Sequence, residues 1–425
     1  MKSNKMIKLS AMTLAALLAV AVAGCSKAEV SSNSGDTAPA VTTQASDKPA
    51  ASTSETTETD TTITTAATAG ASKLETSDMF SDRDLEQTAD LTAATQIKLT
   101  SDKDVTLDQE GVYVLSGEIR NATVIVDAPE DAKVQIVLDG VSITNEDSPA
   151  IYAKEADKVF VTSTASENYM KVTGTYTADG ETNLDAVIFS RADLTMNGTG
   201  SLDIVSSQGN GISSKDDLTV TGGEFSIHSA ADALEANDSI RIHDGTITID
   251  SGKDALHSEN EDDASLGYIY MDGGTLNINA GDDGVRGNSI VQIDGGTINI
   301  ETCQEGIEGN YIQLNDGQIT INAQDDGINA SQKVDSNVVI EVNGGTIDVS
   351  MASGDTDAFD ANGNIVINGG TITVQGASAF DADGTAQLNG GDVTVNGEKI
   401  TEITVSRGGG GGGRGGAGGG RGMRQ

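Results

Sequence analysis

Short runs in which hydrophobic and polar residues alternate recur along most of the chain. A Gly-Gly or Asp-Gly pair is followed by apolar residues at alternate positions, as in GGTINI and GGTITV. An apolar period of two indicates a β-strand. Successive copies are 22, 29, 22, 21, 28, 25 and 21 residues apart, measured between the second glycines. These glycines are Gly223, Gly245, Gly274, Gly296, Gly317, Gly345, Gly370 and Gly391.

Each repeat holds three such strands, illustrated by Ile298 with Ile300, by Gly306-Ile307, and by Ile312 with Leu314. This length leaves no room for the helix that joins parallel strands in ordinary sheets. We therefore predict an all-β fold, a three-faced right-handed parallel β-helix (a β-solenoid) with about 21–29 residues per coil. Glycines at the corners would provide positive φ angles or close backbone approach. The inward stack is predicted to contain Ile247, Leu276, Ile298, Ile319, Ile347 and Ile372.

Two repeats are lengthened by insertions at corresponding places, residues 258–267 and 331–337. Both insertions lie between the second and third strands of their repeat. Stacking is expected to place them on one edge of the solenoid, two coils apart, as the two sides of a groove. Functional residues favour loops of this kind.

The first 24 residues have the pattern of a signal peptide. Lys2, Lys5 and Lys8 precede an apolar run over 11–23, which is shorter than the ~20 residues needed to span a bilayer. The following Val-Ala-Gly-Cys resembles the lipobox of bacterial lipoproteins, which implies that Cys25 is lipidated and becomes the mature N-terminus. The alternative is an ordinary signal peptide with a chance cysteine.

Composition divides the remaining chain into three parts. Residues 25–80 hold the lipidated cysteine and a Ser/Thr-rich linker, which lacks a hydrophobic period and is expected to be disordered. Residues 81–405 form the predicted β-helix domain. Residues 406–425 hold twelve glycines and four arginines, and we expect a disordered tail. The alternative for the tail is a basic contact to the acidic domain or to an anionic wall polymer.

The formal net charge of −40 excludes non-specific binding to nucleic acid, which depends on Lys and Arg. It also argues against direct adsorption to anionic lipid, so membrane attachment is expected through the lipid anchor only. Two cysteines cannot form a disulfide scaffold. We expect a monomer anchored at the extracellular face of the cell membrane.

A polar residue, usually acidic, precedes the second strand of each repeat. Stacking of the coils should arrange these residues in a column, with successive members about 4.8 Å apart. Carboxylates at that spacing repel one another, so they need either cations or backbone N–H partners. Ca²⁺ takes six to eight oxygen ligands and is the expected cofactor. The alternative is that the aspartates only cap corners, as in Asx turns. The predicted calcium ligands are Asp254, Asp282, Asp283, Glu305, Glu308, Asp325, Asp326 and Asp357.

Outward polar residues form further columns, which offer hydrogen bonds and stacking surfaces to a long hydroxylated polymer. The alternative is that they are only solvated β-faces, in which Thr248 and Asn277 belong to stabilising ladders. The absence of Trp weakens the case for a flat aromatic platform. The candidate sugar-binding residues are Tyr268, Tyr270, Tyr311, Gln292 and Gln313.

Signals for catalysis are few, since the chain contains neither G-x-S-x-G nor H-E-x-x-H. Arg286 is the one strong base in the acidic columns and is a weak candidate for a lyase base. The alternative is that it neutralises acidic neighbours. His228, His243 and His257 lack metal-ligand spacing, and Cys303 is expected to be a buried thiol.

The run Ser148-Pro149-Ala150-Ile151-Tyr152, then Asp185-Ala186-Val187-Ile188 and the later G-G-T-I and D-G-I turns resemble bacterial carbohydrate-binding β-helix lipoproteins. The resemblance covers roughly 95–405 and implies a fold related to polysaccharide lyases, binding of cellulose or acidic, pectin-like sugars, and calcium sites.

We therefore predict a cell-surface lipoprotein that binds polysaccharide on a calcium-stabilised β-helix and is not an enzyme. The two alternatives are a calcium-dependent polysaccharide lyase and a surface adhesin or spacer without glycan specificity.

Overall fold

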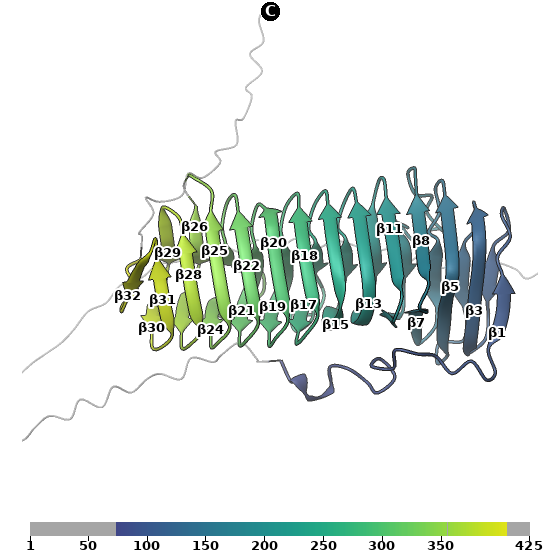
Figure 1. Ribbon diagram of the computed structural model, residues 1–425, viewed down its shortest axis with the longest axis horizontal. Coiled ribbons are helices and arrows are strands. Elements are labelled where there is room, and N and C mark those ends of the chain that lie inside the picture. The colour runs from purple at the N-terminus through teal and green to yellow at the C-terminus, as the bar shows by residue number, and fades with distance from the viewer. Residues whose placement is uncertain (1–73, 355, 406–425) are drawn as a thin grey trace, which may run out of the picture. The chain divides into compact units, whose positions relative to one another are not determined.

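The computed structural model describes residues 74–354 and 356–405. Cys25, the predicted signal peptide, most of the predicted linker and the Gly/Arg tail lie outside the described residues. The described chain forms a parallel β-solenoid of about 12 turns, which confirms the predicted fold class (Figure 1). Its one helical element is the 3-10 helix η1 (Thr76–Asp78), and no helix in this part of the chain is long and apolar enough to cross a membrane.

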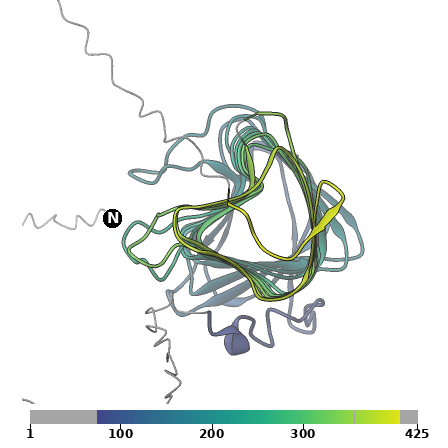
Figure 2. The same cartoon turned by 90° about the vertical axis from the view of Figure 1, so that its left-hand side faces the viewer.

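The strands form three parallel stacks, and Figure 2 looks along them. The first stack follows the glycine pairs and contains β8 (Glu167–Val172), β11 (Ser201–Ser206), β18 (Thr275–Ala280), β20 (Thr297–Cys303), β22 (Gln318–Ala323), β25 (Thr346–Met351), β28 (Thr371–Gln375) and β31 (Asp392–Val395). The second stack follows the acidic corners and contains β2 (Val105–Leu107), β4 (Val124–Asp127), β6 (Ile151–Glu155), β9 (Ala186–Ser190), β12 (Asn210–Ser214), β14 (Leu234–Ala236), β16 (Leu256–Ser258), β23 (Ile328–Ala330), β26 (Asp357–Ala361) and β29 (Ser378–Ala382).

The third stack completes each coil. It contains β1 (Thr95–Lys98), β7 (Lys158–Ser163), β10 (Asp193–Gly198), β17 (Tyr268–Met271), β24 (Val339–Val342), β27 (Asn364–Ile367) and β30 (Ala386–Leu388). Six longer strands turn a corner and belong to two stacks: β3 (Gly111–Arg120), β5 (Lys133–Asn145), β13 (Asp217–Ser229), β15 (Ser239–Ser251), β19 (Val285–Ile293) and β21 (Ile307–Leu314). The last strand, β32 (Glu398–Ile400), pairs antiparallel with β31.

The core consists of aliphatic columns inside the coils. The predicted column from Ile247 to Ile372 is confirmed, because each member is the strand partner of the next. All six side chains are at most 1% exposed. The core is therefore filled by aliphatic side chains that occupy the same position in every coil, rather than by the large aromatic rings of an ordinary core.

The two glycines of a corner have different tasks. Gly296 has a φ of +88°, a conformation that L-residues rarely adopt. A Cβ on the preceding Gly295 would lie 2.5 Å from the carbonyl oxygen of Asp272 in the previous coil. The second glycine of the pair therefore allows the positive φ angle of the turn, and the first leaves room for adjacent coils to stack closely.

The segment 74–94 precedes the solenoid and its residues contact the third stack. Asp84 is 2.8 Å from Lys158 Nζ and accepts a 2.6 Å hydrogen bond from Thr195. Arg83 lies 4.4 Å above the ring of Phe160. The predicted linker boundary at residue 80 was too late, since residues 74–80, including the buried Met79, belong to this segment.

Candidate functional site

A groove lies over the second stack, between the loops that contain the two insertions. Loop 259–267 joins β16 to β17, and loop 331–338 joins β23 to β24. We call the space between them the loop groove. Residues from both loops line it together with two from β19: Glu259, Asn260, Glu261, Ala264, Arg286, Asn288, Lys333 and Val334. The loops are three coils apart rather than the predicted two. In the second stack, β16 pairs with β19, β19 with β21 and β21 with β23, so there are three steps from the first loop to the second.

Charged side chains form a column along the second stack beneath the loops. Strand register stacks Glu235 on His257, His257 on Arg286, Arg286 on Glu308 and Glu308 on Asn329. Two basic groups, His257 and Arg286, thus lie between the acidic groups Glu235 and Glu308. A charged ligand placed along the groove would meet both signs.

The acidic column at the preceding corner serves first as a cap for the backbone. The N–H of Asp254 donates to Oδ1 of Asp232 at 3.1 Å, and that of Asp283 donates to Oδ1 of Asp254 at 3.0 Å. The N–H of Asp357 donates to Oδ1 of Asp326 at 2.9 Å. The corner-cap alternative is therefore correct for these residues. Each cap uses one carboxylate oxygen, and Oδ2 of Asp232 and of Asp254 instead faces His257.

Five of the eight predicted calcium ligands lie in two adjoining clusters. Ligand oxygens of Asp254, Asp282 and Asp283 lie within 4.8 Å of one another, and so do those of Asp283, Glu305 and Glu308. These oxygen-only donor sets fit a hard divalent cation. Burial and the neighbouring carboxylates raise the pKa of Asp283 to about 8 and that of Glu305 to about 7.

The other three predicted ligands lie elsewhere. Asp325 is exposed, Asp326 acts as the cap described above, and Asp357 stacks in the coil beyond Asp326. The doubling of aspartate at 325–326 therefore does not reproduce the cluster that Asp282 and Asp283 make. Glu308 completes the second cluster from the neighbouring column.

Two cations lie beside these clusters. Arg286 Nε is 3.3 Å from Glu308 Oε2, and its Nη1 is 3.7 Å from Asp283 Oδ2 and 3.9 Å from Asp254 Oδ2. Burial alone would lower the pKa of Arg286, but Glu308 and Asp254 raise it, which makes the guanidinium a poor base. Lys333, on the second loop, is 2.6 Å from Glu308 Oε1. Lys333 was not predicted from the sequence. The feature that could have indicated it is that it is the one basic residue of the insertion 331–337.

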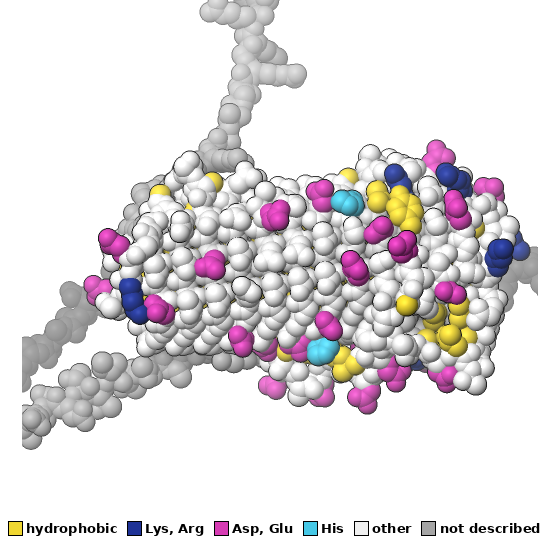
Figure 3. All heavy atoms as spheres, in the orientation of Figure 1, with side chains coloured by type: hydrophobic (Ala, Val, Ile, Leu, Met, Phe, Trp, Pro, Cys, Tyr) yellow, Lys and Arg dark blue, Asp and Glu magenta, His cyan; other side chains and the backbone are white. Residues whose placement is uncertain are grey.

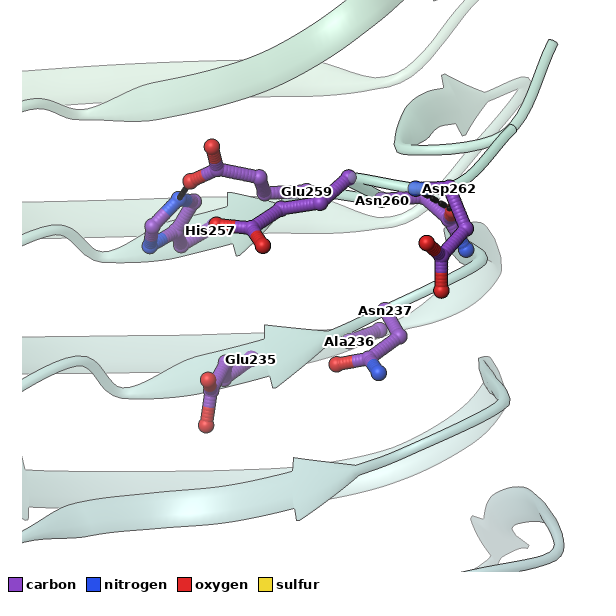
Figure 4. Close-up of a pocket in the computed structure, with 8 residues that line it drawn as sticks. Glu235, Ala236, Asn237, His257, Glu259, Asn260 and Asp262 are labelled. Atoms are coloured by element: carbon purple, nitrogen blue, oxygen red, sulfur yellow. Dashed lines mark hydrogen bonds and ion pairs between the residues drawn. The ribbon is translucent and has the colours of Figure 1, made fainter. Parts of the chain in front are cut away.

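A second pocket opens beside the first loop (Figure 4). It is lined by Glu235, Ala236, Asn237, His257 and loop residues 259–262. His257 Nε2 is 3.2 Å from Glu259 Oε2, so the loop is tied to the second stack by this contact. The first-stack face is mostly neutral side chains and backbone, with acidic groups scattered over it and a few basic, histidine and hydrophobic side chains (Figure 3).

The candidate sugar-binding residues do not form an exposed strip. Tyr270, Gln292 and Gln313 stack as predicted, but they are at most 4% exposed, and Tyr311 is 6% exposed. Phe80 packs 6.1 Å from the ring of Tyr270, and Tyr268 reaches Met79.

Several of the candidate sugar-binding residues are hydrogen-bonded to acidic neighbours. Gln292 donates to Asp294 at 2.9 Å, while Gln313 and Tyr311 both donate to Glu341. The strip is covered partly by the segment 74–94 and partly bound to its own acidic neighbours. Cys303, in the first stack, is the buried thiol that was predicted, and burial raises its pKa to about 12.

Comparison with known proteins gives the family. The family model for carbohydrate-binding domain-containing proteins matches residues 101–358 and 310–399, and the chain belongs to this family. A carbohydrate-binding domain-containing protein of Acetivibrio thermocellus is 32% identical over 130 residues, which are 30% of this chain and 46% of the relative. The chain thus matches less than half of that relative's length. A solved structure, the gadolinium derivative of a polysaccharide lyase-like protein from C. thermocellum, aligns over 71% of this chain and 96% of its own at 23% identity, with a TM-score of 0.42.

Proposed function

We propose that the solenoid binds an acidic polysaccharide along the loop groove and that it has no catalytic activity. The observation that carries this proposal is the groove itself, which two loops border above a column that contains both acidic and basic side chains. Arg286 and Lys333 are placed to pair with carboxylates of a polymer, and the amide of Asn288 can bond hydroxyl groups. Membership of the carbohydrate-binding family supports this assignment.

Calcium is part of the proposal. The residues that would hold it are Asp254, Asp282, Asp283, Glu305 and Glu308, whose oxygens already gather in two clusters. Bound Ca²⁺ would neutralise these carboxylates and could bridge them to those of the polymer. The acidic chain would then attract an acidic partner despite its net charge.

The lyase alternative needs a base beside the polymer. Arg286 is held by three carboxylates that favour its charged form, and Lys333 is held by Glu308. Both groups are thus better suited to binding than to removing a proton. Absorbance of unsaturated products from polygalacturonate would reveal lyase activity and contradict this part of the proposal.

The binding experiment uses polygalacturonate and cellulose with the purified protein, in calcium and in chelator. We expect chelation to weaken binding to polygalacturonate at least tenfold. The double variant Asp283→Asn with Glu305→Gln should lose the calcium effect, because it removes the ligand that the two clusters share and a second ligand of one of them. The matched control is Asp325→Asn, which removes an exposed acid of the same ladder and should bind like the wild type. Equal binding by all three proteins, with and without calcium, would contradict the calcium proposal.

We also propose that Cys25 is lipidated and holds the domain at the cell surface. Support comes from the basic, apolar and Cys-containing segments in their order along residues 2–25. We expect Cys25→Ser to release the protein from the membrane fraction of cells that produce it. Retention of this variant at the wild-type level would show that another feature anchors the chain.

A further inference from the structure

His257 lies between the acidic ladder and the first loop, next to the oxygen-only cluster of Asp254, Asp282 and Asp283. Its Nδ1 is 3.5 Å from Asp232 Oδ2 and 3.4 Å from Asp254 Oδ2. Ligand atoms of these three residues lie within 4.8 Å of one another. Asp232 and Asp254 are 6% and 4% exposed, so both carboxylates are held in a largely dry site.

All three side chains are oriented by contacts on their far sides. Oδ1 of Asp232 and Oδ1 of Asp254 accept backbone N–H groups of the next coil, which directs both Oδ2 atoms toward His257. The opposite ring nitrogen, Nε2, lies 3.2 Å from Glu259 Oε2. A carboxylate on the far nitrogen is the usual arrangement around a histidine that binds a metal, because it fixes the tautomer and raises ligand basicity.

We propose that Asp232, Asp254 and His257 form a binding site for a transition-metal ion of the zinc class, which adjoins the calcium clusters and shares Asp254 with the first of them. Zinc ligands lie about 2.0–2.1 Å from the ion in a tetrahedron, which separates neighbouring ligand atoms by about 3.3–3.4 Å. The two distances from Nδ1 match this edge. The nitrogen donor favours zinc over calcium, since Ca²⁺ takes oxygen ligands and imidazole suits Zn²⁺, Cu²⁺ and Ni²⁺.

Three protein ligands leave one position for water. His257 also lines the pocket with Glu235 and Glu259, so solvent has access to its side of the site (Figure 4). Three protein ligands with one position for water is the arrangement of open zinc sites, whereas purely structural zinc sites take four protein ligands. The ion would join the ladder to the loop that borders the groove, because Glu259 belongs to that loop and bonds the ligating ring.

The competing interpretation is a protonated His257 that forms ion pairs without metal. Burial would lower the pKa of His257, but Asp232 and Asp254 raise it, so the ring can carry the charge in a metal-free protein. Arg286 is 3.9 Å from Asp254 and opposes a further cation, although its shorter contacts are to Glu308 and Asp283. Metal binding itself separates the two interpretations.

The test titrates the chelator-stripped full chain with Zn²⁺ alone by calorimetry, and with Co²⁺ alone by visible absorbance. We expect one Zn²⁺ per chain at this site and the strong absorbance of four-coordinate Co²⁺. His257→Gln should weaken Zn²⁺ binding at least ~100-fold, and Glu259→Gln by about tenfold, since loss of an outer-shell partner costs about 10–100-fold.

The matched control is His228→Gln, which removes a histidine that pairs with Asp250 on the first stack. This variant should bind Zn²⁺ like the wild type. Thermal unfolding in chelator checks that His257→Gln remains folded, and Glu259→Gln provides the second test because it leaves all three ligands in place. Zn²⁺ binding unchanged by His257→Gln, or no wild-type binding below 1 mM, would overturn the proposal. The result does not depend on glycan binding, which is measured without Zn²⁺.

Discussion

A single carboxylate in this protein can accept a backbone hydrogen bond with one oxygen and face a cationic group with the other. Asp254 caps the backbone of the next coil with Oδ1, while its Oδ2 faces His257 and Arg286. The two interpretations of the acidic column, as corner caps or as cation ligands, are therefore compatible within one residue. A sequence pattern alone could not show this division, because it depends on how each carboxylate is rotated.

Asp84 provides a prediction at the same scale. Burial would raise its pKa, but hydrogen bonds from Lys158, Ser81 and Thr195 lower it from 3.8 to about 2. A depressed folded-state pKa stabilises the folded state above the unfolded value, and this stability is lost as pH falls from about 4 towards 2. We expect Asp84→Asn to cost about 2 kcal/mol in the opening free energy of the segment 74–94 at pH 7, by the size of the shift.

Hydrogen exchange of residues 79–87, corrected for intrinsic rates, measures that free energy. The difference between variant and wild type should shrink as the pH is lowered below 4. The exposed Asp82→Asn is the control and should exchange like the wild type. A difference that stayed constant down to pH 2 would show that the charge of Asp84 does not hold the segment.

Among the elements, the corners were only partly predictable. The repeated glycine pairs predicted turns at the right places, and positive φ angles at all eight second glycines confirm them. The asparagine ladder before these pairs was not predicted. In it Asn343 donates to Asn315 at 2.8 Å, Asn368 to Asn343 at 2.9 Å and Asn389 to Asn368 at 2.9 Å. Its signal, a repeated N-G-G, was present, but an asparagine beside a turn glycine is common for purely local reasons.

Gly344 provides the prediction for these elements. A Cβ there would lie 2.3 Å from the carbonyl oxygen of Asn315, a backbone atom fixed by strand pairing. We expect Gly344→Ala to reduce the free energy of unfolding by roughly 1–3 kcal/mol, the usual cost of overpacking. Gly354→Ala is the matched control, because its Cβ would meet only Thr356 Cγ2 at 3.5 Å. Urea unfolding of both variants measures the difference, and equal midpoints would refute the close-approach explanation.

At the scale of the whole molecule, the repeat made the solenoid predictable and left its surface less so. Each coil is built like the next, so one correct assignment of the inward residues, such as Ile298 and Ile300, applies to the whole stack. The burial of Tyr270 depends instead on Phe80, which reaches it from a segment outside the repeats. No periodic signal describes such a contact. The loop groove was predictable because both insertions interrupt the period, whereas the ion pair of Lys333 with Glu308 required the loop's path.

The same architecture predicts how substitutions combine. Ile247 and Ile372 belong to one core column but are separated by five steps of register, or about 24 Å at about 4.8 Å per step. Ile347 and Ile372 are direct strand partners. Each Ile→Val change should cost about 0.5–1.5 kcal/mol.

Because each coil contacts only its neighbours, the distant pair should be additive within about 0.5 kcal/mol, while the adjacent pair should show a larger coupling energy. Urea unfolding of the single and double variants gives both coupling energies. If the distant pair couples as strongly as the adjacent pair, strain must pass through all the intervening coils. The solenoid would then behave as one rigid unit rather than as a stack of neighbours.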